Sequence, residues 1–200
     1  MREILYAKSK KTFEPLPLCA SEPLQEIFLP LTQITKPMKK TILLLLFVTV
    51  FANAQNAEKE KINKTIDAWH KAAGEVKFDA YFDLMADDAI FIGTDATENW
   101  NKKDFKIWAK PFFDKGKTWN FTALERHIFF DKTGNVAWFD ELLNTQMKIC
   151  RGSGVLVKVG KEWKIQHYVL SMTVPNDEVN AAIKIKAPIE DALIEKLKKK

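Results

Sequence analysis

The chain has 200 residues, of which 46% are hydrophobic and 12% aromatic, enough for one core of ordinary size with little room for a second domain. Its net charge is +5, but residues 56–200 carry only 24 Lys and Arg against 22 Asp and Glu. Four of those lysines lie in the terminal KLKKK, which we interpret as a solvated end, so this balance argues against nucleic-acid binding.

The first 37 residues show no sustained hydrophobic periodicity and contain prolines at positions 15, 17, 23, 30 and 37. We interpret residues 1–37 as a non-native extension that arises from a misassigned start codon, because a well-formed signal peptide follows them. A lipoprotein centred on Cys19 is the alternative, but neither an apolar run nor small residues precede this cysteine. We therefore leave residues 1–37 out of the expected fold.

Residues 38–54 have the three parts of a signal peptide. Two lysines follow Met38, residues 42–51 form an apolar run, and an Ala-Asn-Ala motif ends at Ala54. The run is too short to span a bilayer, which takes about 20 residues. A buried strand or helix is the alternative, but four consecutive leucines with no polar residue among them argue against it. We predict cleavage after Ala54, a periplasmic or secreted location, and no stable membrane insertion afterwards.

The next segments have the periodicity of helices. In residues 56–77, apolar side chains recur at spacings of four, three and four, from Ile62 to Ala73, which predicts an amphipathic helix packed through Trp69. A second helix is predicted from Phe78 to about residue 85, and residues 89–93 follow as a short buried strand. After a turn at residues 97–100, a third helix is predicted, which is kinked by Pro111 and ends near residue 116.

From about residue 118 the period changes to two, and β-branched and aromatic residues dominate. Strands are predicted over residues 118–131, 136–149, 153–159 and 162–172, joined as two hairpins through the turns KTGN and GKE. The expected fold class is therefore α+β, with three N-terminal helices packed on a strongly curved antiparallel sheet.

Three segments carry a resemblance to a known family: FIGTDATENW, AWFDE and CRGSGVLVKVGKEWKIQHYVLSMTVPND. They resemble the SnoaL-like branch of the nuclear-transport-factor-2-like (NTF2-like) superfamily, over about residues 58–178. The resemblance implies a cone-shaped, cystatin-like roll with a conical pocket, which we assign to residues 55–178. Separately, we expect residues 179–200 to form a helical basic tail. It implies no single activity, because this scaffold carries isomerases, dehydratases, cyclases, epoxide hydrolases and non-catalytic modules.

The last two predicted strands supply three candidate site residues. Strict alternation places His167 on the same face as Trp163 and Ile165, where it could act as a general base near neutral pH. The same parity places Arg151 and Ser153 on the pocket side, where the arginine could grip a carboxylate or an enolate. The structural alternatives are a core or rim histidine and an ion pair of Arg151 at the sheet margin, and a bulge at Gly152 would reverse the parity.

The middle strands supply further candidates. In AWFDELL at most one of Asp140 and Glu141 points inward, and we expect Asp140 near Trp138 to serve as acid or base with a raised pKa. The alternative is that the carboxylate only neutralises Arg151 or His127. His127 is a weaker candidate for ligand binding, and Trp100 could line the pocket, although such aromatic residues are often plain core.

No metal or cofactor is expected. The three histidines are far apart and form no paired motif. Cys150 is the single cysteine after Cys19 is set aside, so no internal disulfide can form, and no surrounding pattern makes it a nucleophile. Where ketosteroid isomerases draw on a tyrosine of the first helix region, this chain has Trp69 and His70.

Three functions remain open. The first is the binding of a small, mostly apolar or aromatic molecule, oriented by Arg151, His167 and Asp140. The second is cofactor-independent acid–base catalysis of the isomerase, dehydratase or hydrolase type by the same residues. The third is a dimeric interaction module with a filled interior. A homodimer is expected in any case, because the alternation leaves Leu156, Tyr168 and Leu170 on the exposed face of the sheet.

Overall fold

The computed structural model describes residues 38–199, with side chains from Gln55 onward. The predicted extension 1–37 lies outside the described residues. The predicted signal peptide 38–54 is described only as helical backbone, and nothing in the structure tests its cleavage. The chain divides into two units after Leu46, and the fold below is that of the second unit.

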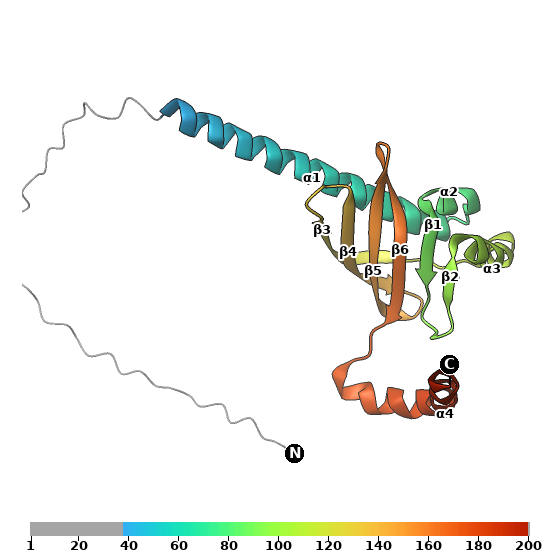
Figure 1. The fold of residues 1–200 in the computed structure, drawn as a ribbon. Coiled ribbons are helices and arrows are strands. Elements are labelled where there is room, and N and C mark those ends of the chain that lie inside the picture. Colours follow the sequence, from blue (N-terminus) through green and yellow to red (C-terminus); the bar gives the residue numbers. More distant parts are fainter. Residues whose placement is uncertain (1–37, 200) are drawn as a thin grey trace, which may run out of the picture. The chain divides into compact units, whose positions relative to one another are not determined.

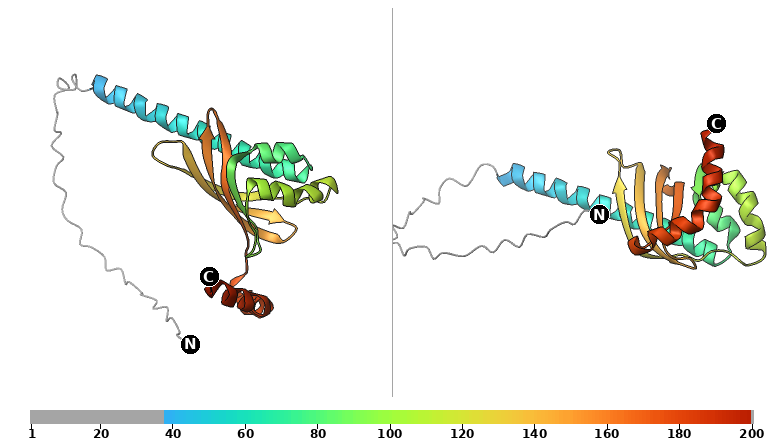
Figure 2. Two further views of the ribbon diagram at one scale, coloured as in Figure 1. Left: turned by 45° about the vertical axis from the view of Figure 1, so that its right-hand side comes forward. Right: turned by 90° about the horizontal axis from the view of Figure 1, so that it is seen from below.

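Six strands form one curled, unclosed sheet in the order β2-β1-β6-β5-β4-β3. Neighbouring strands are antiparallel except β1 and β6, which pair in parallel. Helix α1 crosses one face of the sheet, and α2 and α3 lie beside β1 and β2 (Figures 1 and 2). The helices and strands are α1 Met38–Gly74, α2 Phe78–Asp83, β1 Met85–Ile92, β2 Asn99–Asn101, α3 Lys102–Asp114, β3 Thr122–Phe130, β4 Val136–Thr145, β5 Lys148–Val159, β6 Glu162–Met172, the short 3₁₀ helix η1 Asn176–Glu178, and α4 Val179–Lys198.

The predicted α+β class and the three helices against a curved sheet are confirmed. Two local predictions were wrong. The predicted turn at residues 97–100 contains the start of β2, and the predicted strand 136–149 is broken by a turn before Lys148, which adopts a positive φ of 69°. In the described part of the chain, no helix is long and apolar enough to cross a membrane.

Aromatic side chains fill the space between the helices and the sheet. The predicted apolar face of α1 is buried from Ile62 to Ala73, and Trp69 on that face stacks on Tyr81 at 5.0 Å between ring centroids. Phe91 of β1 stacks on Phe105 of α3 at 4.2 Å. Rings packed in this way contribute both buried area and specific geometry.

A β-bulge in β6 determines which residues face this core. Leu156 and Val155 of β5 pair with Ile165 and His167, so Gln166 is one extra residue in β6. The bulge reverses the alternation, because the strand keeps its period of two on either side of the extra residue. Tyr168 therefore faces the core and His167 faces away, with Ile165 and Tyr168 both fully buried.

The predicted basis for dimerisation was therefore wrong. Leu156, Tyr168 and Leu170 were expected on the exposed face, but they are 0%, 0% and 5% exposed and belong to the core. The outer face of the sheet instead carries a stacked pair, Phe129 and Trp138, whose ring centroids lie 5.9 Å apart and which are each 46% exposed.

Glu58 joins α1 to the hairpin end of β5 and β6. Its carboxylate accepts hydrogen bonds from Trp163 Nε1 at 2.8 Å and from Lys158 Nζ at 3.0 Å. Hydrogen bonds from Lys61, Trp163 and Lys158 lower the pKa of Glu58 from 4.5 to about 2, and the bond from Lys61 has the largest effect. An ionised Glu58 therefore stabilises the packing of α1 on the sheet.

We expect E58Q to lower the free energy of unfolding by about 1–2 kcal/mol at neutral pH, a value reduced because the side chain is partly exposed. A lowered pKa contributes stability that is present above 4.5 and is lost as the pH falls towards about 2. The difference between wild type and E58Q should therefore shrink over that interval. Urea unfolding of both proteins across this pH range measures it, and a difference that does not change with pH contradicts the assignment.

Candidate functional site

A buried carboxylate, Glu141 of β4, is the centre of a hydrogen-bonded network between α1 and the sheet. Glu141 is 1% exposed and His70 of α1 is 4% exposed. His70 Nε2 lies 2.8 Å from Glu141 Oε1, and the Tyr168 hydroxyl donates to the same oxygen at 3.1 Å. One carboxylate oxygen thus holds two side chains from different elements.

Arg126 of β3 holds the other oxygen of Glu141. Its Nε donates to Glu141 Oε2 at 2.9 Å, and its Nη2 lies 2.8 Å from the same oxygen. Its Nη1 donates to Asp67 Oδ1 at 2.8 Å and to Asn63 Oδ1 at 3.1 Å. The guanidinium is therefore a bridge between α1 and β4, in which Nε makes the hydrogen bond to Glu141 and Nη2 contributes by its charge.

The charges in this network follow from its geometry. Burial acts to raise the pKa of Glu141, but the hydrogen bond from His70, the charge that His70 carries when its ring is protonated, and the charge of Arg126 outweigh it and hold this pKa below 4.5. Burial and the neighbouring Glu141 raise the pKa of Tyr168 well above 10. Near neutral pH, Glu141 is thus an anion and Tyr168 is a hydrogen-bond donor.

An ionised carboxylate only accepts hydrogen bonds, so we assign a proton to His70 Nε2. In a neutral ring Nδ1 is then the basic nitrogen. A carboxylate that fixes the tautomer and orientation of an imidazole is the arrangement that general acid–base catalysis requires of its histidine.

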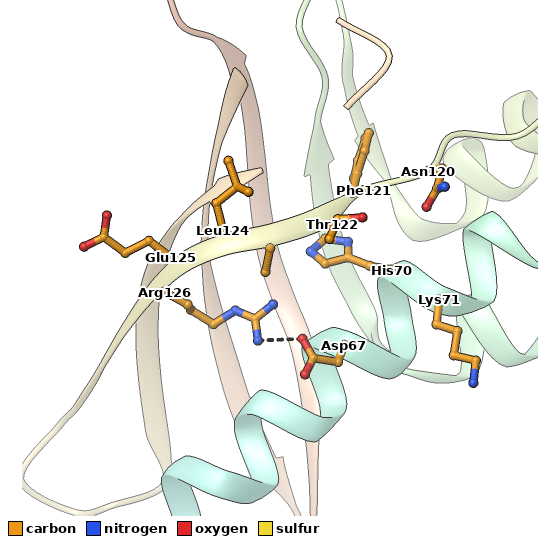
Figure 3. Close-up of a pocket in the computed structure, with 10 residues that line it drawn as sticks. Asp67, His70, Lys71, Asn120, Phe121, Thr122, Leu124, Glu125 and Arg126 are labelled. Carbon is orange, nitrogen blue, oxygen red and sulfur yellow. Dashed lines mark hydrogen bonds and ion pairs between the residues drawn. The ribbon is translucent and has the colours of Figure 1, made fainter. Parts of the chain in front are cut away.

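A groove of about 490 Å³ borders this network (Figure 3). Its walls are Asp67, His70 and Lys71 of α1 and residues 120–126, at and before the start of β3. His70 and Arg126 therefore belong both to the buried network and to the groove. Phe121, whose ring lies edge-on to His70 at 5.6 Å, supplies an apolar wall beside the imidazole.

Two buried polar groups lie near His70, in the aromatic core. Trp69 Nε1 has no hydrogen-bond partner within the described part of the protein. The Tyr81 hydroxyl makes no hydrogen bond of regular geometry there, and Trp119 is the donor that approaches it. The Trp69 ring is 5.3 Å from the His70 ring and 5.0 Å from the Tyr81 ring. Buried donors without partners are uncommon in folded proteins and call for an explanation.

Six of the seven predicted site residues lie on the outer face of the sheet, away from α1. The inward placement predicted for His167, Arg151, Ser153 and Asp140 was therefore wrong. For His167 the cause is the bulge at Gln166. For Arg151 and Ser153 the cause is that β5 turns the neighbouring Gly152 and Gly154 inward, so the residues with longer side chains point out. His127 Nε2 lies 3.1 Å from Glu125 Oε1, and Glu125 lines the groove. The part of all six residues in binding a ligand stays a prediction.

The remaining outward residues are Asp140, His127 and Trp138. Of the two adjacent carboxylates, Glu141 points inward and Asp140 outward, where its Oδ1 lies 3.0 Å from His127 Nδ1. This hydrogen bond to Asp140, with a weaker contribution from Glu125, raises the pKa of the exposed His127 above 6.5. Asp140 and His127 thus form a surface pair, which agrees with the alternative that the carboxylate neutralises His127.

Trp100, the seventh predicted residue, packs in the aromatic cluster rather than at the groove. Its ring stacks on Trp108 at 4.7 Å and on Phe105 at 5.6 Å, which agrees with the alternative of plain core. Within residues 38–199, no three His, Cys, Asp or Glu side chains are placed to hold a metal ion.

Four residues of the observed network were missed as site residues: His70, Glu141, Arg126 and Tyr168. The position of His70 carries a signal, because it follows Trp69 on the face that Ile62, Ile66 and Ala73 define. A polar residue on such a face needs a buried partner. The identity of that partner comes from sheet register and could not be obtained from spacing along the chain.

Comparison with known proteins assigns the chain to a family. The family model of the SnoaL-like domain matches residues 62–175, more than half of the chain. None of the curated proteins matches it in sequence.

Several solved structures have a similar fold. One is an NTF2-like protein of unknown function from Pseudomonas putida KT2440, with 15% identity, a TM-score of 0.52, and coverage of 62% of this chain and 91% of that chain. A candidate dehydratase of the NTF2-like family from Streptomyces avermitilis has 12% identity, a TM-score of 0.53, and coverage of 60% and 99%. A candidate scytalone dehydratase from Novosphingobium aromaticivorans DSM 12444 has 11% identity, a TM-score of 0.52, and coverage of 62% and 89%. At these identities the similarity concerns the fold alone. The chain belongs to the SnoaL-like domain family, within the NTF2-like superfamily.

Proposed function

We propose that this protein binds a small, mostly apolar or aromatic molecule in the groove between α1 and β3, and that His70 performs proton transfer on it. The observation that carries the proposal is the double position of His70, which borders the groove and is held by the buried, ionised Glu141. A base that borders a groove and whose orientation is fixed by a carboxylate suits cofactor-independent isomerisation or dehydration.

The names of similar folds support the same proposal. Two solved structures with this fold are named as candidate dehydratases, and dehydration is a reaction that a positioned base such as His70 could promote.

The test is a screen of small aromatic carbonyl and hydroxy compounds by NMR, with the ring nitrogens of the three histidines as reporters. We expect binders to shift the His70 signals and not those of His127. Removal of the base typically lowers such catalysis by about 10²–10⁴-fold, so H70Q should abolish any turnover found. H127Q is the matched control, because His127 is also paired with a carboxylate but lies on the outer face. Binding that leaves His70 unchanged, or turnover that survives H70Q, contradicts the proposal.

Dimerisation through the outer face is a second candidate role, favoured by the exposed Phe129 and Trp138 pair. If two copies bury this pair, W138E should give a monomer at micromolar concentration, because a charge in the middle of an apolar contact is costly. Light scattering of wild type and W138E measures the change. A wild type that is already monomeric rules out this role for the pair.

Export is also proposed, on the basis of the basic start, apolar run and Ala-Asn-Ala motif of residues 38–54. We expect the mature protein to begin at Gln55. Intact-mass measurement of the protein from the periplasm or the medium tests this expectation. A product that retains Met1 contradicts it.

A further inference from the structure

Helix α4, Val179–Lys198, follows β6 after a short linker (Figure 1) and has no buried residue over its 20 positions. It nevertheless carries large apolar side chains that are exposed to solvent. Ile185 and Ile189 are 76% and 75% exposed, and Ile183, Ile194 and Leu197 are also exposed. An isolated helix of this length gains little stability by itself, so these side chains indicate a surface on which α4 docks.

The apolar side chains gather on one half of the helix. At 3.6 residues per turn, that half contains Val179, Ile183, Ile185, Ile189, Leu193, Ile194 and Leu197. The opposite half carries only polar and small residues, including Asn180, Lys184, Asp191, Glu195 and Lys198. A helix with this division fits a flat interface between an apolar and a polar phase.

The charge of α4 indicates which kind of surface the helix docks on. Residues 179–200 carry six lysines against Glu190, Asp191 and Glu195. Within the described residues, Lys184, Lys196 and Lys199 form no ion pair, whereas Lys186 pairs with Glu190 at 3.2 Å. Lys196 and Lys199 lie at one margin of the apolar half. Unpaired lysines in this position are complementary to anionic lipid headgroups, because their stems can lie along the apolar phase while the ammonium groups stay in water.

The net positive charge of residues 179–200, with six lysines against three acidic residues, separates an anionic membrane from a second copy as the partner of α4. Two copies of α4 would bring like charges together, whereas anionic headgroups attract them. We propose that α4 is an interfacial anchor that docks the folded domain on anionic glycerophospholipid membranes without spanning them.

The experiment uses the protein as cells produce it, with its N-terminus read by mass spectrometry. Vesicles of phosphatidylcholine alone are compared with vesicles containing phosphatidylglycerol, by co-sedimentation and by hydrogen exchange. We expect binding to the anionic vesicles, weakened by salt, with slower exchange confined to residues 179–198. The exchange measurement separates α4 from any binding by an uncleaved apolar leader.

Two sets of variants complete the test. Replacing Lys184, Lys196 and Lys199 by Gln should lower the partition coefficient about fivefold per lysine, and I185E/I189E should abolish protection of α4. The control replaces Lys103, Lys132 and Lys161 by Gln, which removes the same charge from exposed positions on the domain. Since α4 is exposed, all variants should melt like wild type. Unprotected α4 on anionic vesicles, equal binding by both lysine variants, or protection of α4 by self-association without vesicles overturns the proposal.

Discussion

Replacing Glu141 by alanine is expected to lower the free energy of unfolding by about 3–5 kcal/mol, the cost of breaking a buried ion pair by removing one partner. Glu141 is 1% exposed and receives hydrogen bonds from Arg126, His70 and Tyr168. Without the carboxylate, the Arg126 guanidinium is left as a charge in the interior with Asp67 as its remaining acidic partner. Urea unfolding at neutral pH measures the loss.

Asp140 provides the matched control because it is the adjacent residue in the same strand. Its side chain is 50% exposed and its partner is the exposed His127. D140A should cost less than about 1 kcal/mol, as exposed ion pairs do. Equal losses for E141A and D140A would show that the buried network does not hold α1 on the sheet.

The pH dependence of this contribution has a definite sign. The pKa of Glu141 lies below 4.5 in the folded protein, so its stabilisation is present above 4.5 and decreases as the pH falls below that value. The stability difference between wild type and E141Q should therefore be largest near neutral pH and diminish in acid.

The helices and the fold class could be predicted because their signals are local. The apolar spacing from Ile62 to Ala73 depends only on residues within one helix, and the structure buries these residues as expected. The change of period after residue 118 likewise marks the sheet without any knowledge of which strands pair. The parallel pairing of β1 with β6 has no such signal, because it joins residues 77 to 80 positions apart.

The candidate site failed for a reason that alternation cannot reveal. Side-chain parity along a strand is correct only from a known starting residue and only up to the next bulge. The bulge at Gln166 moved His167 outward and Tyr168 inward, and β5 was assigned the wrong phase from Arg151 onward. The sequence indicates a potential bulge at Gly152 of β5, but the observed bulge lies in the neighbouring strand β6, at Gln166.

The correct parity explains why β5 has glycines at positions 152 and 154. Both face the core, and both stand where partner side chains approach the backbone closely. A Cβ on Gly154 would lie 2.7 Å from Phe139 Cε1 and 2.5 Å from the carbonyl oxygen of His167. A Cβ on Gly152 would overlap the Tyr168 hydroxyl and lie 2.8 Å from Glu141 Oε1. The glycines thus leave the room in which the buried network forms.

We therefore expect G152A to destabilise the fold by about 1–3 kcal/mol, the usual cost of adding a methyl group to a packed interior. The new methyl group must displace the Tyr168 hydroxyl or the Glu141 carboxylate, so the variant should also lose the hydrogen bond between them. A ligand that shifts the NMR signals of His70 in the wild type should bind G152A more weakly, because Glu141 no longer holds the imidazole in place.

S153A is the control for G152A. Ser153 is the next residue of β5, but its side chain points to the outer face and takes no part in the network. The added methyl group of G152A and the removed hydroxyl of S153A are both small changes, one on each side of the same strand. Urea unfolding and NMR of the His70 ring, measured for both variants, separate the two faces. If G152A matches S153A in both measurements, then the Tyr168 and Glu141 contact does not support His70, and the proposed proton-transfer site loses its basis.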